Sequence, residues 1–448
     1  MSLHYVKEEL AKAGLSGSLE LFNIITNQNE SITVPKKAIH NFRYIPNKDF
    51  KLVHPNLEVA KELTLLTLSN LSNTWLRSQH SDDERIILGY KRLYSRILES
   101  QVKVCGNRSS PYKKILKLLL KHDYIEIGED AVYIPNGKGK AREFRLTLKY
   151  FGKGCERYFL KTPEVRRMRN IEFNENFERV LQTAIGRNHL RLLTKVTWPT
   201  DDEVRACIDE AVKSRWCNRD HKRMVWLGKH SKKEYPHSQF VHGEDYMKSF
   251  RFLRDHMKVP VVKKEWMDDD GNLKFRIATC FNLMPKLIRN LIKIGNHSIV
   301  ENDFSAMHPN IIQKIYGGSN LEPISHQSVS EYLGISKDDA KKEHLSFFNK
   351  RICQMKASPL WNYYEVKEPK MLENILQEKC QHGHEKTCWR VFEIETRLME
   401  TIVSRLSAMG IDVIYVYDAL YSTAEEQEVV KEVMNSVVRE FNIHSRVK

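Results

Sequence analysis

The sequence has few of the features that mark exported, membrane-spanning or disulfide-stabilised proteins. No apolar run approaches the roughly 18 residues that a membrane-spanning helix needs, and the N-terminus carries no apolar core of a secretion signal. The eight cysteines are scattered and none forms a Cys-x-x-Cys pair, so we expect reduced thiols. Repeats and low-complexity tracts are also absent. These absences predict a cytoplasmic protein without a membrane partner.

Acidic residues are outnumbered by basic ones. The chain holds 72 Lys and Arg against 57 Asp and Glu, which gives a net charge of +15. A basic surface concentrates polyanions, so nucleic acid is the expected partner, and a generally basic protein without that function is the alternative. The 448 residues are enough for two or three domains with cores of their own.

Residues 78–150 carry a pattern of helices followed by a hairpin. Tyr90–Leu98 is predicted as an amphipathic helix, and Pro111 opens a second helix over Tyr112–His122. Alternating residues from Asp123 onward predict a strand that ends in a turn. The segment Ala131–Pro135, a Gly/Lys-rich tip at Asn136–Lys140 and the segment Arg142–Leu148 follow and complete a hairpin pattern. This order resembles winged-helix domains, in which the tip contacts phosphate. The resemblance implies phosphate contacts from Lys138, Lys140 and Arg142.

Two aspartates in the C-terminal half each end a short run of β-branched and aromatic residues. Asp303 follows Ile299–Asn302, and Asp418 follows Val413–Tyr417. Such runs predict strands that present a carboxylate at the tip. Two carboxylates brought together by folding can hold a pair of Mg²⁺ ions for phosphoryl transfer, with Mn²⁺ as the alternative ion.

The segments around the aspartates follow a definite order. A helical segment at Asn290–Ile294 and a turn at Gly295-Asn296 are predicted before the first strand. A long helix over Phe392–Leu406, which stops near Gly410, is predicted before the second strand. Between the two aspartates, Ser336 is expected to cap a lysine-rich helix.

This order is similar to the palm of DNA polymerase I-like (family A) enzymes and of single-subunit phage RNA polymerases. Asp303-Phe-Ser-Ala-Met-His308 resembles the family A motif Asp-Tyr-Ser-x-x-Glu, and Tyr417-Asp418-Ala419 stands where that family has His-Asp-Glu. Asp303, Phe304 and Pro309 also match the Asp-Phe-x-Ser-Leu-Tyr-Pro segment of family B polymerases. The departures at His308, Tyr417 and Ala419 leave the choice between deoxyribose and ribose substrates open.

The resemblance implies an α+β right-hand polymerase with palm, fingers and thumb. Its regions are a helical N-terminal part (1–77), the winged-helix-like domain (78–150), a basic thumb-like region (151–265) and a palm (266–448) with a fingers insertion at about 313–390. Asp303 and Asp418 would be catalytic and hold the metals, with the backbone carbonyl of Phe304 as a further ligand. The implied nucleotide-binding residues are Lys341 or Lys342, Phe347 or Phe348, and His308, and the implied primer and template contacts are Arg276, Asn282, Lys286 and Arg289.

The expected function is therefore a template-directed nucleotidyltransferase that uses primed DNA and nucleoside triphosphates, of a kind suited to a phage or mobile element. A primase or single-subunit RNA polymerase is the alternative within this class. A DNA-binding replication initiator or regulator with a vestigial palm is the alternative outside it, and a metal-dependent nuclease is a third. A zinc site at Cys380, His382, His384 and Cys388 also stays open, because the residue types suit zinc although the spacing matches no common finger.

Overall fold

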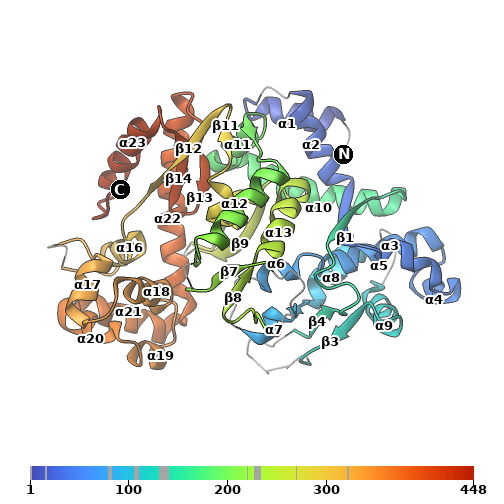
Figure 1. The fold of residues 1–448 in the computed structure, drawn as a ribbon, viewed down its shortest axis with the longest axis horizontal. Coiled ribbons are helices and arrows are strands. Elements are labelled where there is room, and N and C mark those ends of the chain that lie inside the picture. The colour runs from blue at the N-terminus through green and yellow to red at the C-terminus, as the bar shows by residue number, and fades with distance from the viewer. Residues whose placement is uncertain are drawn as a thin grey trace. The chain divides into compact units, whose positions relative to one another are not determined.

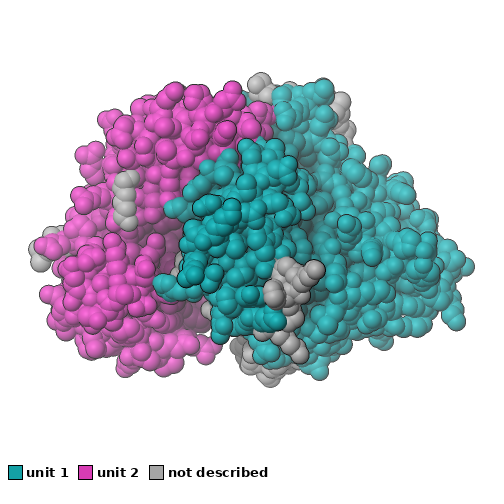
Figure 2. Space-filling model, in the orientation of Figure 1, with its two compact units in different colours: residues 1–178, 198–259, 283–291 teal, residues 179–197, 260–282, 292–448 magenta. Residues whose placement is uncertain are grey.

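The computed structural model describes residues 3–15, 18–78, 83–104, 110–130, 141–218, 220–226, 234–268, 270–319 and 322–447. The chain forms two compact units, which Figure 2 distinguishes by colour. Unit 1 comprises residues 1–178, 198–259 and 283–291, and unit 2 comprises residues 179–197, 260–282 and 292–448. Both helices and several small sheets are present, which confirms the expected α+β class. Within the described ranges, no helix combines the length and apolarity needed to cross a membrane.

The N-terminal part of unit 1 is mostly helical, as the sequence predicts. Asn56 caps helix α5 by accepting hydrogen bonds from the backbone N–H groups of Glu58 and Val59. Leu63 and Leu66 of this helix belong to a hydrophobic core that extends through residues 32–165. The elements of this part are α1 (Leu3–Lys12), α2 (Leu19–Asn29), β1 (Ser31–Pro35), α3 (Ala38–Asn41), the 3₁₀ helix η1 (Phe42–Tyr44), α4 (Asn47–Val53), α5 (Leu57–Ser69) and α6 (Thr74–Ser78).

The next part of unit 1 contains the segment expected to be winged-helix-like. Its elements are α7 (Glu84–Ile87), β2 (Lys91–Arg92), α8 (Ser95–Val102), α9 (Tyr112–Lys121), β3 (Ile125–Ile127) and β4 (Glu143–Leu146). The three strands form an antiparallel sheet in the order β2-β4-β3. The predicted second helix and the strands predicted from Asp123 and over Arg142–Leu148 are confirmed as α9, β3 and β4, whereas residues 131–135 of the predicted hairpin lie outside the described residues. The helix predicted over Tyr90–Leu98 is wrong in its first half, because Lys91 and Arg92 pair with β4 and the helix begins only at Ser95. The tip with Lys138 and Lys140 lies outside the described residues.

The remainder of unit 1 places a parallel strand pair beside two helices. Val225 of β7 pairs with His242 of β8, immediately before helix α13 begins at Gly243. The side chain of Ile208 and the ring of Trp226 lie so close to Gly243 that a Cβ there would collide with Ile208. The elements are β5 (Cys155–Phe159, paired with β1), α10 (Pro163–Gln182, which continues into unit 2), α12 (Asp201–Lys213), β7 (Arg223–Val225), β8 (Phe240–His242), α13 (Gly243–His256) and α15 (Lys286–Arg289).

Unit 2 is built on a five-stranded sheet in the order β13-β14-β12-β11-β6. Helices α11 and α23 pack on this sheet, and α22 packs against both of them. Every residue of β14, which lies between β13 and β12, is buried, as expected for a strand covered on both faces. The strands and covering helices are α11 (Ala184–Leu192), β6 (Val196–Thr197), β11 (Lys293–Ile294), β12 (His297–Asp303), α22 (Glu385–Ala408), β13 (Ile414–Val416), β14 (Ala419–Thr423) and α23 (Gln427–Glu440) (Figure 1).

One prediction near this sheet is wrong. Asn290–Ile294 was predicted to be helical, but Lys293 and Ile294 form strand β11. The strand is held on both sides, by β12 through the turn at Gly295-Asn296 and by β6. Ladder hydrogen bonds to two neighbours therefore override the local helical spacing.

The strand before Asp303, the long helix and the strand before Asp418 are confirmed as elements. The long helix α22 ends at Ala408, and Gly410 adopts the left-handed conformation (φ 78°) that commonly follows a helix end. The rest of unit 2 is a hairpin, β9 (Val261–Met267) with β10 (Leu273–Ala278), followed by α14 (Cys280–Leu283), which runs into unit 1. The elements between β12 and α22 in the described part of the chain are the helices α16 (Met307–Ile315), α17 (His326–Leu333), α18 (Lys337–Phe347), α19 (Ile352–Lys356), α20 (Leu360–Lys367) and α21 (Pro369–His382).

Candidate active site

The two predicted aspartates meet at one end of the sheet in unit 2. Strands β12 and β14 are antiparallel neighbours, and their register places Asp303 directly opposite Ala419. Val416 pairs with the same Ala419, so Tyr417 and Asp418 form a two-residue turn between β13 and β14. Facing residues of antiparallel strands have Cα atoms about 5 Å apart. Asp418, one residue before Ala419, is therefore a close neighbour of Asp303.

A buried amide fixes this register. Asn302 is fully buried, and its Nδ2 donates to the hydroxyl of Ser422 (3.2 Å) and to the carbonyl of Leu420 (3.4 Å). A slip by one residue would move Asn302 to the other face of the strand and break these bonds. On the opposite face, Tyr421 donates a hydrogen bond to Glu301 across the same strand pair. The side chains beside the aspartates thus hold the two acidic residues at the same end of the sheet.

Strained backbone lies beside both aspartates. Tyr417 has φ 57° and Ala306, three residues after Asp303, has φ 49° and ψ 47°. A non-glycine residue in this left-handed region costs about 1–3 kcal/mol, and such residues cluster at active sites and ligand clamps. The strain at both turns favours a functional role for this end of the sheet.

A buried carboxylate on α22 pairs with two basic residues near Asp418. Glu395 is fully buried and forms an ion pair with the guanidinium of Arg276 on β10. Its other oxygen lies 2.8 Å from Nε2 of His308 on α16. The guanidinium also lies over the rings of Phe392 and Tyr417, 4.6 and 4.7 Å from their centroids. Glu395 therefore links β10, α16 and, through Arg276, the turn that carries Asp418.

Burial and the neighbouring charges shift the pKa values of Asp418 and His308. Burial raises the pKa of Asp418, and the negative charge of Glu395 raises it further, whereas His308 and Arg276 oppose the shift. Burial acts to lower the pKa of His308, but its hydrogen bond to Glu395 and the charges of Glu395 and Asp418 outweigh burial and raise it. A cation bound at Asp418 would favour its ionised form and so oppose the effect of burial.

Asp303 and Asp418 suit a hard divalent ion. Mg²⁺ binds oxygen ligands and typically takes only one or two carboxylates from a protein, with water and phosphate oxygens completing its shell. Phe304, the predicted carbonyl ligand, follows β12 directly and forms an isolated bridge to Val447. Among the residues that the structure describes, three convergent His, Cys, Asp or Glu ligand atoms occur only in unit 1, at His237, His242 and Asp245. Asp303 and Asp418 would supply two carboxylate ligands to such an ion, which is within the number that Mg²⁺ typically takes from a protein.

The predicted nucleotide-binding residues on α18 divide into two groups. Lys341 and Lys342 are exposed to solvent and remain candidates for contacting a triphosphate. Phe347 and Phe348 are buried, and Phe347 stacks on Tyr364 with ring centroids 5.3 Å apart. This packing in the core of the helical segment argues against the predicted stacking on a base.

The predicted primer and template contacts also divide by burial. Arg276 and Arg289 are each only 7% exposed, so neither offers its guanidinium to a phosphate in this structure. Arg276 is held by Glu395 in unit 2, and Arg289, in unit 1, donates to the carbonyl of Met284 (3.3 Å). Asn282 accepts from the backbone N–H of Thr279 (2.7 Å), whereas Lys286 is exposed.

Arg142, the described member of the predicted wing contacts, stands in unit 1 with an ion pair to Asp130 (3.0 Å). Its side chain is half-exposed. The alternative zinc cluster at 380–388 does not assemble, because its side chains are not among the convergent ligand groups of the described residues.

Sequence reasoning assigned no role to Glu395, although a signal was present. Val391, Glu395, Leu398 and Ile402 follow one another at helical spacing and form one buried face of α22. A glutamate at an otherwise apolar position of this kind is rarely buried unless it has a partner. The sequence pattern therefore indicates that Glu395 has a charged or hydrogen-bonding partner, but it does not identify that partner.

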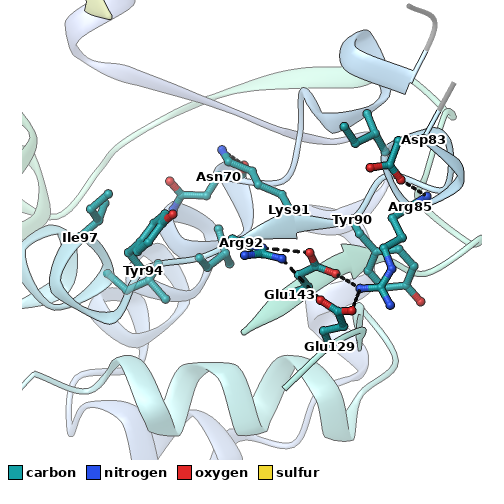
Figure 3. Close-up of a pocket in the computed structure, with 13 residues that line it drawn as sticks. Asn70, Asp83, Arg85, Tyr90, Lys91, Arg92, Tyr94, Ile97, Glu129 and Glu143 are labelled. Carbon is teal, nitrogen blue, oxygen red and sulfur yellow. Dashed lines mark hydrogen bonds and ion pairs between the residues drawn. The ribbon is translucent and has the colours of Figure 1, made fainter. Parts of the chain in front are cut away.

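Unit 1 contains a pocket of about 650 Å³ beside β2, shown in Figure 3. Arg85 pairs there with Glu129 (2.7 Å) and Glu143 (2.8 Å), and Arg92 pairs with the same two glutamates (3.4 and 3.0 Å). Asp83 and Lys91 also line the pocket, so its three basic residues match its three acidic ones and leave no net charge to attract a metal ion. It is better explained as the ionic support of the β2–β4 edge.

No protein-family model matches the chain, and no curated protein gives a significant match. The candidate active site therefore rests on its own geometry and chemistry.

Proposed function

We propose that this chain is a template-directed nucleotidyltransferase, of DNA polymerase type, that extends a nucleic-acid 3′-hydroxyl. The observation that carries the proposal is the strand register that sets Asp303 opposite Ala419, with Asp418 in the adjoining turn. One carboxylate from a strand end and one from a neighbouring hairpin turn are the arrangement that the polymerase resemblance implies. The buried carboxylate of Glu395 places a second negative charge near Asp418, which supports cation binding.

The metal ions would be held by Asp303 and Asp418. When bound, a pair of Mg²⁺ ions lowers the pKa of the attacking hydroxyl and neutralises the charge on the triphosphate and leaving pyrophosphate. The residues of the chain have three tasks around this chemistry. The two aspartates anchor the ions, Glu395 orients Arg276 and His308, and the exposed Lys341 and Lys342 offer positive charge to phosphates.

Binding of the template would be supported by the β2–β4 segment of unit 1. Helices α8 and α9 lie between strands β2 and β3 in the chain, and the sheet order is β2-β4-β3. This arrangement is the one expected of a winged helix. Lys113, Lys114 and Lys117 of α9 are all exposed. A helix with one apolar and one lysine-rich face can pack on the core and contact phosphate at the same time.

Primer extension tests the function directly. The chain is incubated with Mg²⁺ and a DNA template, with and without an annealed primer, and with either deoxyribonucleotides or ribonucleotides. We expect extension of the primed template by deoxyribonucleotides. Synthesis from ribonucleotides, or without a primer, would instead indicate the RNA polymerase or primase alternative.

Absence of synthesis under all four conditions, with duplex binding retained, would overturn the proposed function. That result would favour the DNA-binding initiator or regulator with an inactive palm. The exposed lysines of α9 are the observation that supports this second candidate, because DNA binding does not require the aspartates. Duplex binding measured on Lys113→Glu/Lys117→Glu should weaken in either case.

A further inference from the structure

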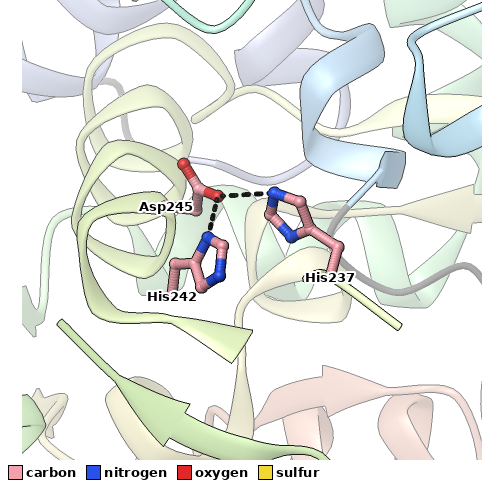
Figure 4. A group of neighbouring side chains, drawn as sticks. All are labelled: His237, His242 and Asp245. Carbon is pink, nitrogen blue, oxygen red and sulfur yellow. Dashed lines mark ion pairs between the residues drawn. The ribbon is translucent and has the colours of Figure 1, made fainter. Parts of the chain in front are cut away.

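A second group of potential metal ligands lies in unit 1, at the junction of β8 and α13. His237, His242 and Asp245 each direct one ligand atom toward the same point, as Figure 4 shows, and these atoms all lie within 4.8 Å of one another. The carboxylate of Asp245 is 3.8 Å from Nε2 of His237 and 3.7 Å from Nδ1 of His242. The group belongs entirely to unit 1.

These separations are too long for direct hydrogen bonds, which join nitrogen and oxygen at about 2.7–3.2 Å. They suit ligands that share an ion. Nitrogen and oxygen atoms about 2.1 Å from one Zn²⁺ stand about 3.4 Å apart in a tetrahedral shell. The observed separations exceed this value by a few tenths of an ångström, which small side-chain rotations can close.

The environment of His242 provides an independent observation. Its side chain is fully buried, and Nε2 lies 2.8 Å from the backbone carbonyl of Tyr235. A carbonyl only accepts hydrogen bonds, so Nε2 must carry the proton, and in the neutral ring Nδ1 then presents a lone pair. Within the described part of the chain, Nδ1 has no hydrogen-bond partner. A buried lone pair that faces a carboxylate is unfavourable without a cation between them.

We propose that His237, His242 and Asp245 bind one divalent transition-metal ion, with Zn²⁺ as the expected ion. The hydrogen bond from His242 to Tyr235 is the outer contact that orients a metal-bound imidazole. Two imidazoles and one carboxylate favour Zn²⁺ over Mg²⁺, which prefers oxygen ligands. Lys248 lies with its Nζ 3.5 Å from the other carboxylate oxygen of Asp245 and leaves the oxygen that faces the histidines to the ion. The ion would fasten residues 235–237 to the start of α13.

Metal analysis of the full chain tests the site. The protein is stripped with a chelator, saturated with Zn²⁺ or Co²⁺, dialysed, and its metal content measured, with the visible absorption of Co²⁺ reporting nitrogen ligation. We expect about one ion per chain, and a rise in melting temperature on Zn²⁺ addition, since a ligand that binds only the folded state stabilises it. His237→Gln and Asp245→Asn should lose the ion and the rise.

Two controls make the result specific. His40→Ala removes an exposed histidine and Asp255→Asn removes another carboxylate of α13, and both variants should retain the ion. A Cys380→Ser/Cys388→Ser variant should also retain it. A wild-type chain that holds no Zn²⁺ or Co²⁺ after dialysis would overturn the proposal, and so would full metal content in His237→Gln and Asp245→Asn. Neither outcome bears on primer extension, which depends on Asp303 and Asp418.

Discussion

The charged pocket of unit 1 and the aspartate cluster of unit 2 contain similar charged residues but differ in how those charges are paired. In unit 1, Arg85 and Arg92 meet Glu129 and Glu143, and every charge in the group has an opposite partner within 3.4 Å. The charges of these four residues therefore neutralise one another. Their ion pairs stabilise the edge where β2 pairs with β4 and do not require a ligand.

The cluster of unit 2 contains a buried carboxylate beside its ion pairs. Glu395 pairs with both Arg276 and His308, and Asp418 lies close enough to feel the charge of all three residues. Burial first, and the negative charge of Glu395 second, raise the pKa of Asp418. The comparison teaches that a buried carboxylate with a raised pKa distinguishes a candidate site from a structural network better than the size of a pocket does.

The largest effect is expected from the aspartates themselves. Asp418→Asn or Asp303→Asn should lower the rate of primer extension by roughly 1,000-fold or more, because the metal ions lose an anchor. The free energy of unfolding should not fall in Asp418→Asn, because burial disfavours the ionised carboxylate of Asp418 and the asparagine amide carries no charge. Rates and melting temperatures are measured together. Glu425→Gln, on the exposed loop after β14, is the matched control, and an equal loss in that variant would contradict the assignment.

The buried ion pair should contribute most to stability. Glu395→Gln leaves the guanidinium of Arg276 buried without an anion, which costs about 3–5 kcal/mol in the free energy of unfolding. Urea denaturation measures the loss. Replacing both partners, as Arg276→Met/Glu395→Leu, should recover a large part of it. A single variant as stable as the exposed control Glu428→Gln would show that the pair is not buried in solution.

The corresponding change in unit 1 should be milder. Glu143→Gln removes the shared acceptor of Arg85 and Arg92, but both arginines are partly exposed and water screens them. We expect a loss of about 1 kcal/mol in the free energy of unfolding. Primer extension should persist. A loss as large as that of Glu395→Gln would remove the distinction between the two clusters.

The smallest expected effect is on the pH dependence of the free energy of unfolding. The pKa of His308 is raised in the folded state by Glu395 and Asp418, so its protonated form stabilises the fold. This stabilisation is present below the ordinary histidine pKa and is lost as pH rises through the raised value. Unfolding free energies of the metal-free wild type should show this decline, and His308→Gln should lack it. An unchanged pH profile in His308→Gln would exclude the proposed contact with Glu395.

Local signals in the sequence predicted much of the sheet end that carries Asp303 and Asp418. The β-branched runs before each aspartate and the long helix ahead of the second one are local features, and all three elements form. The register that joins the two strands is not a local feature. It depends on contacts such as that of Asn302 with Ser422, 120 residues apart in sequence.

Predictions failed where a distant partner overrides a local pattern. Lys91 and Arg92 were predicted to lie in a helix, but they pair with β4. Lys293 and Ile294 were also predicted to be helical, but they form a strand between β12 and β6. The phosphate contact of Arg276, which the polymerase resemblance implies, stays a prediction, and in this structure Arg276 is paired with Glu395, 119 residues away. The base stacking implied for Phe347 or Phe348 also stays a prediction, and in this structure both rings pack against Tyr364.

The ionisation of Asp418 tests the central claim most directly. In protein labelled with ¹³C at the aspartate carboxyl carbons, the Asp418 signal is identified by its loss in Asp418→Asn and followed through an acid titration. Without metal, we expect a pKa above the usual aspartate range, as burial and Glu395 dictate. Addition of Mg²⁺ with a nucleoside triphosphate should shift that pKa downward, because a bound cation favours the carboxylate. A titration that Mg²⁺ leaves unchanged would contradict the claim that Asp303 and Asp418 form a catalytic metal site.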